Sequence, residues 1–444
     1  MSGPREAGAG NRILLSGGCV LSLDRRLGNL RRGDLLIEGT TVKEVGETVS
    51  ARGAEVIDAA DCIVMPGFVD CHRHLWETLF RNLDEPKGFD RQHDNLEADD
   101  LYAATLIGLL GAAEAGITSV VDWSGLSLTG VRAEAVLQAH IDARLRSVLA
   151  LAQDPRMAAG WGDLFHTLSD RARGEGSNAR LAFGPPEPQA GTLDETADEW
   201  ALARQLGAHV HTHAASGESQ AAVEALGARG LLGADVTLAG CTGVDDEGLA
   251  AIGSAGANVA ITPASDMAVG AGFPPLQKLI DRGIRPGLGI ESERSASGDM
   301  FAQMRATISM QHARFFDLKL AGKAGLPNLL TTRDVIRYAT VDGARAAGLG
   351  SGVGSLHPGN QADLIVLRAD RPNIFPVNDP IGAVVWGMDT SNVDWVFVAG
   401  RAIKRAGELQ SDTAHARDLA RASMQRIASG PDAALEAEEV RVSA

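Results

Sequence analysis

The chain has 444 residues, of which 45% are hydrophobic and 22% charged, an ordinary composition for a soluble globular protein. Its 57 acidic residues outnumber its 41 Lys and Arg residues, so the formal net charge is −16, and the sequence contains no basic run. This charge balance argues against a surface that binds nucleic acid or an anionic membrane. A single barrel domain takes about 250 residues, so the length accommodates a barrel and one smaller module.

The four cysteines, Cys19, Cys62, Cys71 and Cys241, show no paired spacing. They therefore support neither a disulfide framework nor an all-cysteine zinc site, and they suit a reducing compartment. The N-terminus lacks the apolar segment of a signal peptide, and no uncharged apolar run of about 18 residues follows it. We expect a cytoplasmic protein.

Both ends of the chain alternate short apolar runs with Gly or Asp turns, a pattern typical of short strands. The predicted strands at the two ends are residues 13–18, 19–23, 34–46, 55–67, 361–367 and 393–403. From this shared pattern we predict that residues 1–65 and 355–405 form one small β-sandwich. Residues 406–444 are expected to form a polar helix and a tail.

Residues 66–354 alternate short buried strands with helices. The predicted strands are residues 68–74, 116–124, 145–152, 179–185, 208–215, 235–241, 257–263 and 285–290, and predicted helices lie at 99–115, 195–207 and 245–256. This alternation favours parallel strands with right-handed crossovers. Because about eight units fit and no Gly-rich phosphate loop appears, we predict an α/β fold with a closed (β/α)8, TIM-like barrel.

His72 and His74 lie two residues apart at the end of the first predicted barrel strand, so they share one face of it. The apolar run at residues 63–69 leads directly into them. Two imidazoles aimed from a buried strand into one cavity are costly without a shared ion. We therefore favour a metal site over two solvent-facing histidines, at the C-terminal ends of the strands, where barrel enzymes carry their chemistry.

Three further histidines, His209, His211 and His213, follow one face of a single later strand. They cannot all bind one ion, because a strand rises about 3.3 Å per residue. His213 lies nearest the C-terminal end and is the predicted ligand. For His209 and His211 a hydrogen-bonded place inside the barrel and a functional role, in substrate binding and in catalysis respectively, both stay open.

Two long motifs, at residues 66–74 and 338–367, make the chain resemble the amidohydrolase superfamily over about residues 10–405. It is most similar to the branch of cytosine deaminase, 8-oxoguanine deaminase and atrazine chlorohydrolase. The resemblance implies one divalent metal ion, zinc or iron, held by His72, His74, His213 and an acidic residue after the eighth strand. Residues 182–186 contain no bridging Lys, which implies a mononuclear centre.

The chain departs from this pattern at the acidic ligand. Glu291 stands where an Asp is usual, and a Glu is a competent but longer oxygen ligand. Glu293 is a competing candidate for the same place. A salt bridge at the barrel mouth, for instance to Arg294, is the alternative role for Glu291.

The proton-transfer positions depart further. Ser216 stands where the family has a Glu, and Gly240 where it has a His. Ser216 cannot act as a general acid near neutral pH. Glu218 is a candidate replacement for the acid, and Cys241 offers a thiol.

Strand positions and the family resemblance together imply a site with three parts. The predicted metal ligands are His72, His74, His213 and Glu291. The predicted catalytic groups are Glu291, His213, His211 and Glu218. The predicted substrate-binding residues are His209, Ser216, Cys241, Trp123 and Glu187, although packing is an alternative role for Trp123 and Glu187.

We predict a metal-assisted hydrolase acting on a non-peptide C–N bond of a small cyclic or aromatic molecule, with atypical proton transfer. A non-hydrolytic enzyme on the same barrel, such as a metal-free lyase, isomerase or cyclase, is the first alternative. A catalytically inactive barrel that binds a ligand or partner is the second. We expect a small-molecule substrate, no nucleic acid or membrane partner, and a homo-oligomer.

Overall fold

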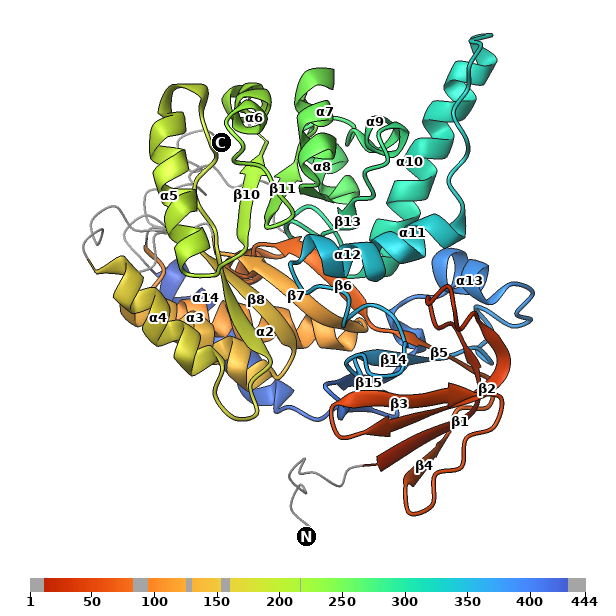
Figure 1. Cartoon of the computed structure of the whole chain (residues 1–444). Coiled ribbons are helices and arrows are strands. Elements are labelled where there is room, and N and C mark those ends of the chain that lie inside the picture. Colours follow the sequence, from red (N-terminus) through yellow and green to blue (C-terminus); the bar gives the residue numbers. More distant parts are fainter. Residues whose placement is uncertain (1–11, 83–94, 125–129, 153–159, 216, 430–444) are drawn as a thin grey trace, which may run out of the picture.

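The computed structural model describes residues 12–82, 95–124, 130–152, 160–215 and 217–429, and it contains two sheets (Figure 1). One is a barrel of eight parallel strands in the order β6 to β13. Its strands are β6 Phe68–Arg73, β7 Ile117–Trp123, β8 Arg146–Leu151, β9 Ala179–Phe183, β10 Val210–Ala214, β11 Val236–Gly240, β12 Asn258–Ile261 and β13 Gly287–Leu288. The predicted fold class is confirmed.

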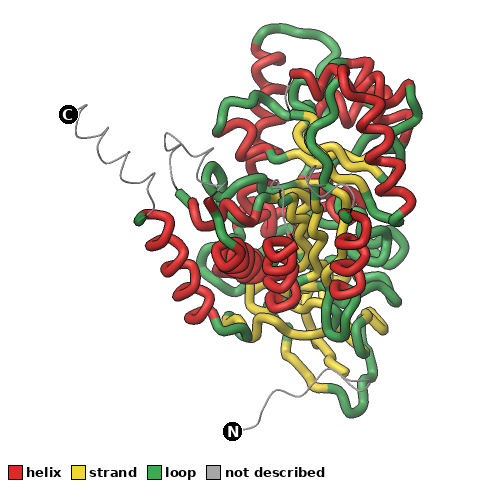
Figure 2. The backbone as a smooth tube through the Cα atoms, turned by 90° about the vertical axis from the view of Figure 1, so that its left-hand side faces the viewer, coloured by secondary structure: helices red, strands yellow, loops and turns green. Residues whose placement is uncertain are grey.

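Helices surround the barrel strands, as the tube view also shows (Figure 2). They are α2 Ala98–Glu114, α3 Gly130–Ala143, α4 Trp161–Ala172, α5 Leu193–Gln205, α6 Gly217–Ala228, α7 Asp246–Ala255, α8 Pro263–Ala268, α9 Leu276–Asp281, α10 Met300–Leu320, α11 Thr332–Tyr338 and α12 Val341–Ala346. Outward-facing strand residues such as Phe68, Leu238 and Val259 pack against helix residues such as Leu109 and Trp200 in the largest core cluster.

Small side chains fill the interior of the barrel and pack against α12. Val69, Ala150 and Ala239 point inward from three strands and pack with Ala344 and Ala346 of α12. Thr237 Oγ1 donates to Ala346 O at 2.7 Å. Helix α12 therefore closes the N-terminal end of the barrel, and polar side chains gather at the other end.

The second sheet has nine strands and is built from both ends of the chain. Its strands are β1 Arg12–Val20, β2 Leu30–Glu38, β3 Thr41–Gly46, β4 Glu55–Asp58, β5 Cys62–Pro66, β14 Leu364–Arg368, β15 Val393–Val398, β16 Arg401–Arg405 and β17 Glu408–Leu409. The two ends meet where β5 pairs antiparallel with β14, and the sheet encloses its own apolar core, to which Leu35, Val64 and Phe397 belong.

The C-terminal boundary differs in detail from our expectation, because β17 carries the sheet beyond residue 405. Helix α14 (Thr413–Ala428) then packs against α2, where Arg426 pairs with Asp100. Residues 430–444, the predicted tail, lie outside the described residues. The short elements η1 Leu75–Phe80, η4 Ala190–Thr192, α13 Pro380–Gly382, η5 Ala383–Gly387 and η6 Thr390–Asn392 complete the described secondary structure.

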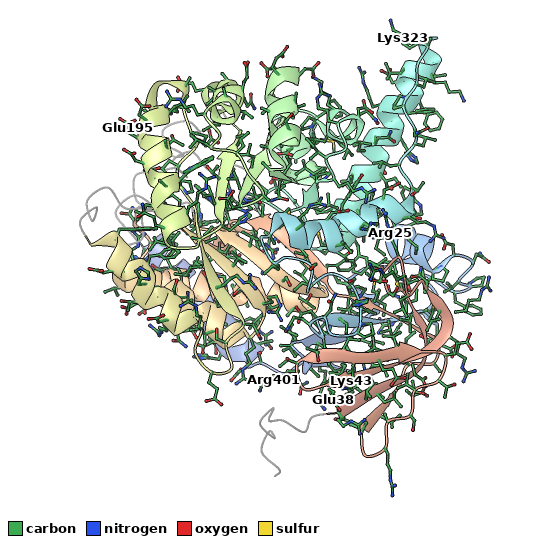
Figure 3. All side chains as sticks on the ribbon, viewed as in Figure 1. Arg25, Glu38, Lys43, Glu195, Lys323 and Arg401 are labelled. Carbon is green, nitrogen blue, oxygen red and sulfur yellow. The ribbon has the colours of Figure 1, made fainter. Side chains whose placement is uncertain are left out.

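The described residues include no helix with the length and apolar character needed to cross a bilayer. Charged side chains, including the labelled Glu195 and Lys323, extend from the periphery of the molecule (Figure 3). The most buried ionic contact between the two sheets joins Arg146 of β8 to Asp363, which precedes β14. The Arg146 Nε–Asp363 Oδ2 distance is 2.5 Å, and Arg146 Nη2 donates to Asp363 Oδ1 at 3.2 Å.

This buried pair yields a stability prediction. Asp363→Ala leaves the Arg146 guanidinium buried and unpaired, which costs about 3–5 kcal/mol of unfolding free energy. Asp170→Ala removes the partner of Arg173, where both side chains are largely exposed, and costs less than about 1 kcal/mol. Urea denaturation of both variants measures the difference, and equal losses would contradict the structural role given to Arg146.

Candidate metal centre

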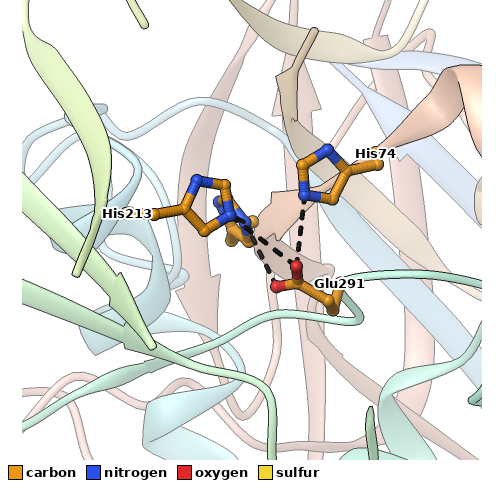
Figure 4. Close-up of side chains that lie close together, drawn as sticks. His74, His213 and Glu291 are labelled. Carbon is orange, nitrogen blue, oxygen red and sulfur yellow. Dashed lines mark hydrogen bonds and ion pairs between the residues drawn. The ribbon is translucent and has the colours of Figure 1, made fainter. Parts of the chain in front are cut away.

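Three histidines converge at the C-terminal ends of β6 and β10. Figure 4 shows two of them, His74 and His213, beside Glu291. His72 is fully buried on β6, and His74 follows the end of that strand. His213 projects from β10 to the same point, and its Nε2 lies 2.9 Å from Nε2 of His72. The rings of His74 and His213 stack with centroids 5.3 Å apart.

Glu291 reaches this point from the turn after β13. Its amide donates to His72 O at 3.0 Å, and its carbonyl accepts from His74 N at 2.8 Å, so the backbone of β6 fixes its position. Its φ of 68° lies in the left-handed region, which is uncommon for a residue other than glycine and recurs at functional sites. The preceding Gly289 permits this approach, because a Cβ there would lie 2.6 Å from His72 O.

The carboxylate of Glu291 lies among the three imidazoles. Oε1 is 3.1 Å from Nε2 of His74 and 3.7 Å from Nε2 of His213, and Oε2 is 3.2 Å from Nε2 of His72. One ligand atom from each of the four residues lies within 4.8 Å of all the others. Glu291 is therefore not simply a partner in a salt bridge at the barrel mouth, which was the alternative role.

Burial and the Glu291 charge give the histidines different proton affinities. Burial lowers the pKa of His72 to about 4, with Glu291 opposing the shift. Burial acts in the same direction on His74, but the hydrogen bond and charge of Glu291 outweigh it and raise the pKa to about 9. Burial would raise the pKa of Glu291, yet the surrounding histidines hold it well below its usual range.

These donors fit one divalent cation. Three imidazoles and a carboxylate are a common ligand set for zinc, and each must be unprotonated to bind. The facing Nε2 atoms of His72 and His213 are both potential lone-pair donors, so a shared cation relieves their mutual repulsion. The site therefore matches a single divalent metal ion.

His211 lies directly beneath the cluster. Its Nε2 is 2.9 Å from Nδ1 of His72, and burial holds the pKa of His211 well below its usual range. His209, by contrast, lies at the opposite end of β10 with its Nε2 2.8 Å from Thr237 Oγ1. The structure thus does not bring His209 to the substrate side, contrary to our prediction, because the rise along the strand separates it from His213.

Trp123 forms a wall of the site at the end of β7. Its ring lies edge-on to His213, with centroids 4.5 Å apart, and to His74, at 5.4 Å. Its Nε1 donates to His211 O at 2.9 Å, which fixes the indole. Glu187 lies beside the end of β10, where its Oε1 accepts from Ala215 N at 3.3 Å.

The predicted replacements for the proton-transfer groups are not brought to the cluster. Glu218 is exposed in the first turn of α6. Cys241 is fully buried and packs in the core between barrel and helices, so a substrate contact through its thiol is not supported. Gly240 has a φ of 87° and carries no side chain, and Ser216 lies outside the described residues.

An ionic network that the sequence reasoning missed braces the first strand. The buried Arg73 lies 3.2 Å from Glu293, which also pairs with Arg81 at 2.8 Å. Asp70 Oδ1 accepts from Ile290 N at 3.1 Å. Glu293 is therefore held away from the histidines by two arginines, which decides its competition with Glu291. Asp70 precedes His72 by two residues, so the alternation along β6 could have indicated that its side chain shares the inward face.

The model of the amidohydrolase family matches residues 63–403 of the chain, from the strand before the first histidine pair to the end region of the second sheet. The chain belongs to the amidohydrolase family. A 5'-deoxyadenosine deaminase of Methanothermobacter thermautotrophicus is 28% identical over 423 residues, covering 90% of this chain and 94% of the relative. A 5-methylthioadenosine/S-adenosylhomocysteine deaminase of Pelotomaculum thermopropionicum is 29% identical, covering 88% and 93%.

Solved structures share the fold. An atrazine chlorohydrolase from Arthrobacter aurescens, in complex with zinc, matches with a TM-score of 0.81 and 21% identity over 93% of this chain and 99% of that chain. A zinc-bound adenosine deaminase from Xanthomonas campestris matches with a TM-score of 0.78 and 22% identity, over 94% and 99%.

Family membership and the His/Glu cluster make this chain a metal-dependent amidohydrolase that hydrolyses C–N bonds. This reaction class is the one predicted from the sequence. The non-hydrolytic and inactive alternatives are not favoured.

The two ends of β10 provide a matched pair of variants. His213→Gln should lower the zinc content of the purified protein from one equivalent to a small fraction, because it removes one of four ligands. His209→Gln changes the same residue type on the same strand and should leave the zinc content unchanged. Elemental analysis measures both, and equal zinc content in the two variants would contradict the site.

Proposed function

We propose that this amidohydrolase releases ammonia from an amino-substituted purine or a related nitrogen heteroaromatic ring, with zinc as its metal. The arrangement of His72, His74, His213 and Glu291 beside the Trp123 indole carries the proposal. The names of the relatives, which are deaminases of adenine nucleosides, support this substrate class. Zinc suits the three-imidazole and carboxylate donor set.

We assign the ligand roles to the four converging residues. These residues would hold a divalent ion, which would supply Lewis-acid chemistry for the activation of water near neutral pH. His72 presents Nε2 to the ion if its Nδ1–H is donated to Nε2 of His211, 2.9 Å away. His211 is thus a positioning residue, which holds the tautomer and the ring orientation of His72.

The Trp123 indole supplies a flat surface next to the reacting centre. Its hydrogen bond to His211 O keeps the ring in place, and its edge contacts with His74 and His213 leave it beside the ligands. An aromatic substrate ring packs well against such a surface. Glu187, near the end of β10, is a candidate for a polar contact with the substrate.

Proton transfer in this enzyme departs from the pattern that the resemblance implied. Gly240 and Ser216 offer neither an imidazole nor a carboxyl, and one general acid–base group contributes about 10²–10⁴-fold to a rate. We therefore propose slow turnover of ordinary substrates such as cytosine or guanine. A substrate with an activated ring carbon or a good leaving group suits the site better.

We further propose a cytoplasmic homo-oligomer that acts on a small molecule. Phe273, before α9, and Phe316 and Leu320 of α10 are exposed apolar side chains, which contact between subunits would cover.

The proposed function is tested with a panel of amino-purine nucleosides, free bases and amino-triazines, with ammonia release as the measurement. We expect the zinc-loaded enzyme to release ammonia from at least one amino-purine nucleoside, and to do so poorly from cytosine and guanine. Removal of zinc by a chelator should abolish the activity, and added zinc should restore it. Full activity of the metal-free protein, or no release from any ring, would contradict the proposal.

A further inference from the structure

One buried carboxyl group at the open end of the barrel has no part in the site described so far. Asp266 lies on α8, directly after β12, and its side chain is 8% exposed. Thr262 Oγ1 donates to its Oδ1 at 3.1 Å. Its other oxygen, Oδ2, is buried and has no hydrogen-bond partner within the part of the chain that the structure describes.

An unsatisfied buried carboxyl oxygen is unfavourable for folding, since it has lost its water and gained nothing in return. Such a group calls for a specific explanation, of which a catalytic role is one, and its position in the fold decides between them. The alternative is that Asp266 has no functional role and is simply buried where α8 packs.

The surroundings of Asp266 connect it to the reacting centre. Glu291, on the turn after β13, is the charged group that acts on the Asp266 carboxyl. Asp266 in turn acts on Cys241, at the end of β11. Ser265, the neighbour of Asp266 on α8, has its Oγ 2.6 Å from Ser295 Oγ in the loop that follows Glu291, so α8 packs beside the segment that carries the metal-centre carboxylate.

We propose that Asp266 is the proton-transfer residue of this enzyme and touches the substrate ring during hydrolysis. The inference rests on the proposed function and deepens it, because it names one acid that supplies part of what Ser216 and Gly240 lack, which still leaves turnover of ordinary substrates slow.

Water adds to the ring carbon, so a C–O bond forms while the C–N bond to the amino group breaks. The Asp266 carboxyl gives its proton to the departing nitrogen, which leaves as ammonia. The carboxylate then takes the proton that the added water gives up, and Asp266 returns to its starting state.

The electrostatic surroundings suit this exchange. Burial, followed by the negative charge of Glu291, raises the pKa of Asp266 to about 7, while its hydrogen bonds from Thr262 oppose the shift. Of the titratable groups that face it, Glu291 carries a negative charge and Cys241 is neutral, because burial raises the pKa of that thiol to about 12. A carboxyl with a pKa near 7 gives and takes protons readily at neutral pH.

A comparison of two leaving groups tells whether Asp266 donates a proton or has only a structural role. Ammonia must acquire a proton as it leaves, whereas chloride needs none. With a substrate that the wild type hydrolyses, Asp266→Asn should lower kcat for the amino compound by about 100-fold or more. The same variant should hydrolyse the chloro analogue within about fivefold of wild type, with unchanged zinc content. Asp266→Glu should recover part of the lost rate.

Asp342→Asn is the matched control. Asp342 is also a buried acid with an unpartnered Oδ2 and a pKa raised by burial, but it lies on α12 at the closed end of the barrel. It should leave both reactions within about twofold of wild type. In the wild type, ammonia release should fall as the pH rises through about 7, because the proton donor is lost, and chloride release should not show this fall.

The outcomes separate this inference from the proposed function. Wild-type enzyme that releases neither ammonia nor chloride from any ring refutes both. Normal wild-type turnover with an equally active Asp266→Asn refutes the role of Asp266 alone, as does an equal loss of the two reactions. If Asp266→Asn fails to fold, the wild-type pH profiles decide, and identical profiles for the two leaving groups overturn the proposal.

Discussion

The close approach of two backbones, those of β6 and the turn after β13, is the contact on which the site depends. His72 O accepts from both Ile290 N and Glu291 N, and Gly289 has no Cβ to obstruct it. The same hydrogen bonds bring the last barrel strand against the first and deliver Glu291 to the histidines. The contact that closes the barrel therefore also brings Glu291 to the histidines. A displaced β13 would remove the only acidic member of the cluster within the described residues.

The surroundings of this contact act differently on the imidazoles, because Glu291 raises the pKa of His74 while burial lowers those of His72 and His211. Burial makes His72 and His211 poor bases for protons, so they stay neutral and can bind a cation or each other. The competing acid, Glu293, is neutralised by Arg73 and Arg81 a short distance away. The site thus concentrates one carboxylate charge on the side where a cation would bind.

Much of this could be predicted from the sequence, because the signals were local. The period of two in β6 and β10 placed His72, His74 and His213 on inward faces, and the alternation of strands and helices indicated the barrel. The rise along a strand also indicated that the three histidines of β10 could not act at one point, although it did not tell which of His209 and His211 would lie near His72.

The errors and omissions concern side-chain direction and long-range contacts. Cys241 adopts a φ of 63°, which turns its thiol into the core, and a sequence pattern does not report such a turn. Gly240 has a φ of 87°, a backbone conformation that a residue with a side chain rarely adopts. Asp266 escaped notice because α8 has six residues and the effect of the Glu291 charge on it depends on the closed barrel.

The central claim is that these four residues bind one metal ion, and X-ray absorption at the zinc edge tests it most directly. For the zinc-loaded protein the account predicts a first shell of nitrogen and oxygen at about 2.0–2.2 Å, with the outer-shell scattering of three imidazoles and no sulfur. A cysteine sulfur at about 2.3 Å, or a shell with fewer than three imidazoles, would contradict it.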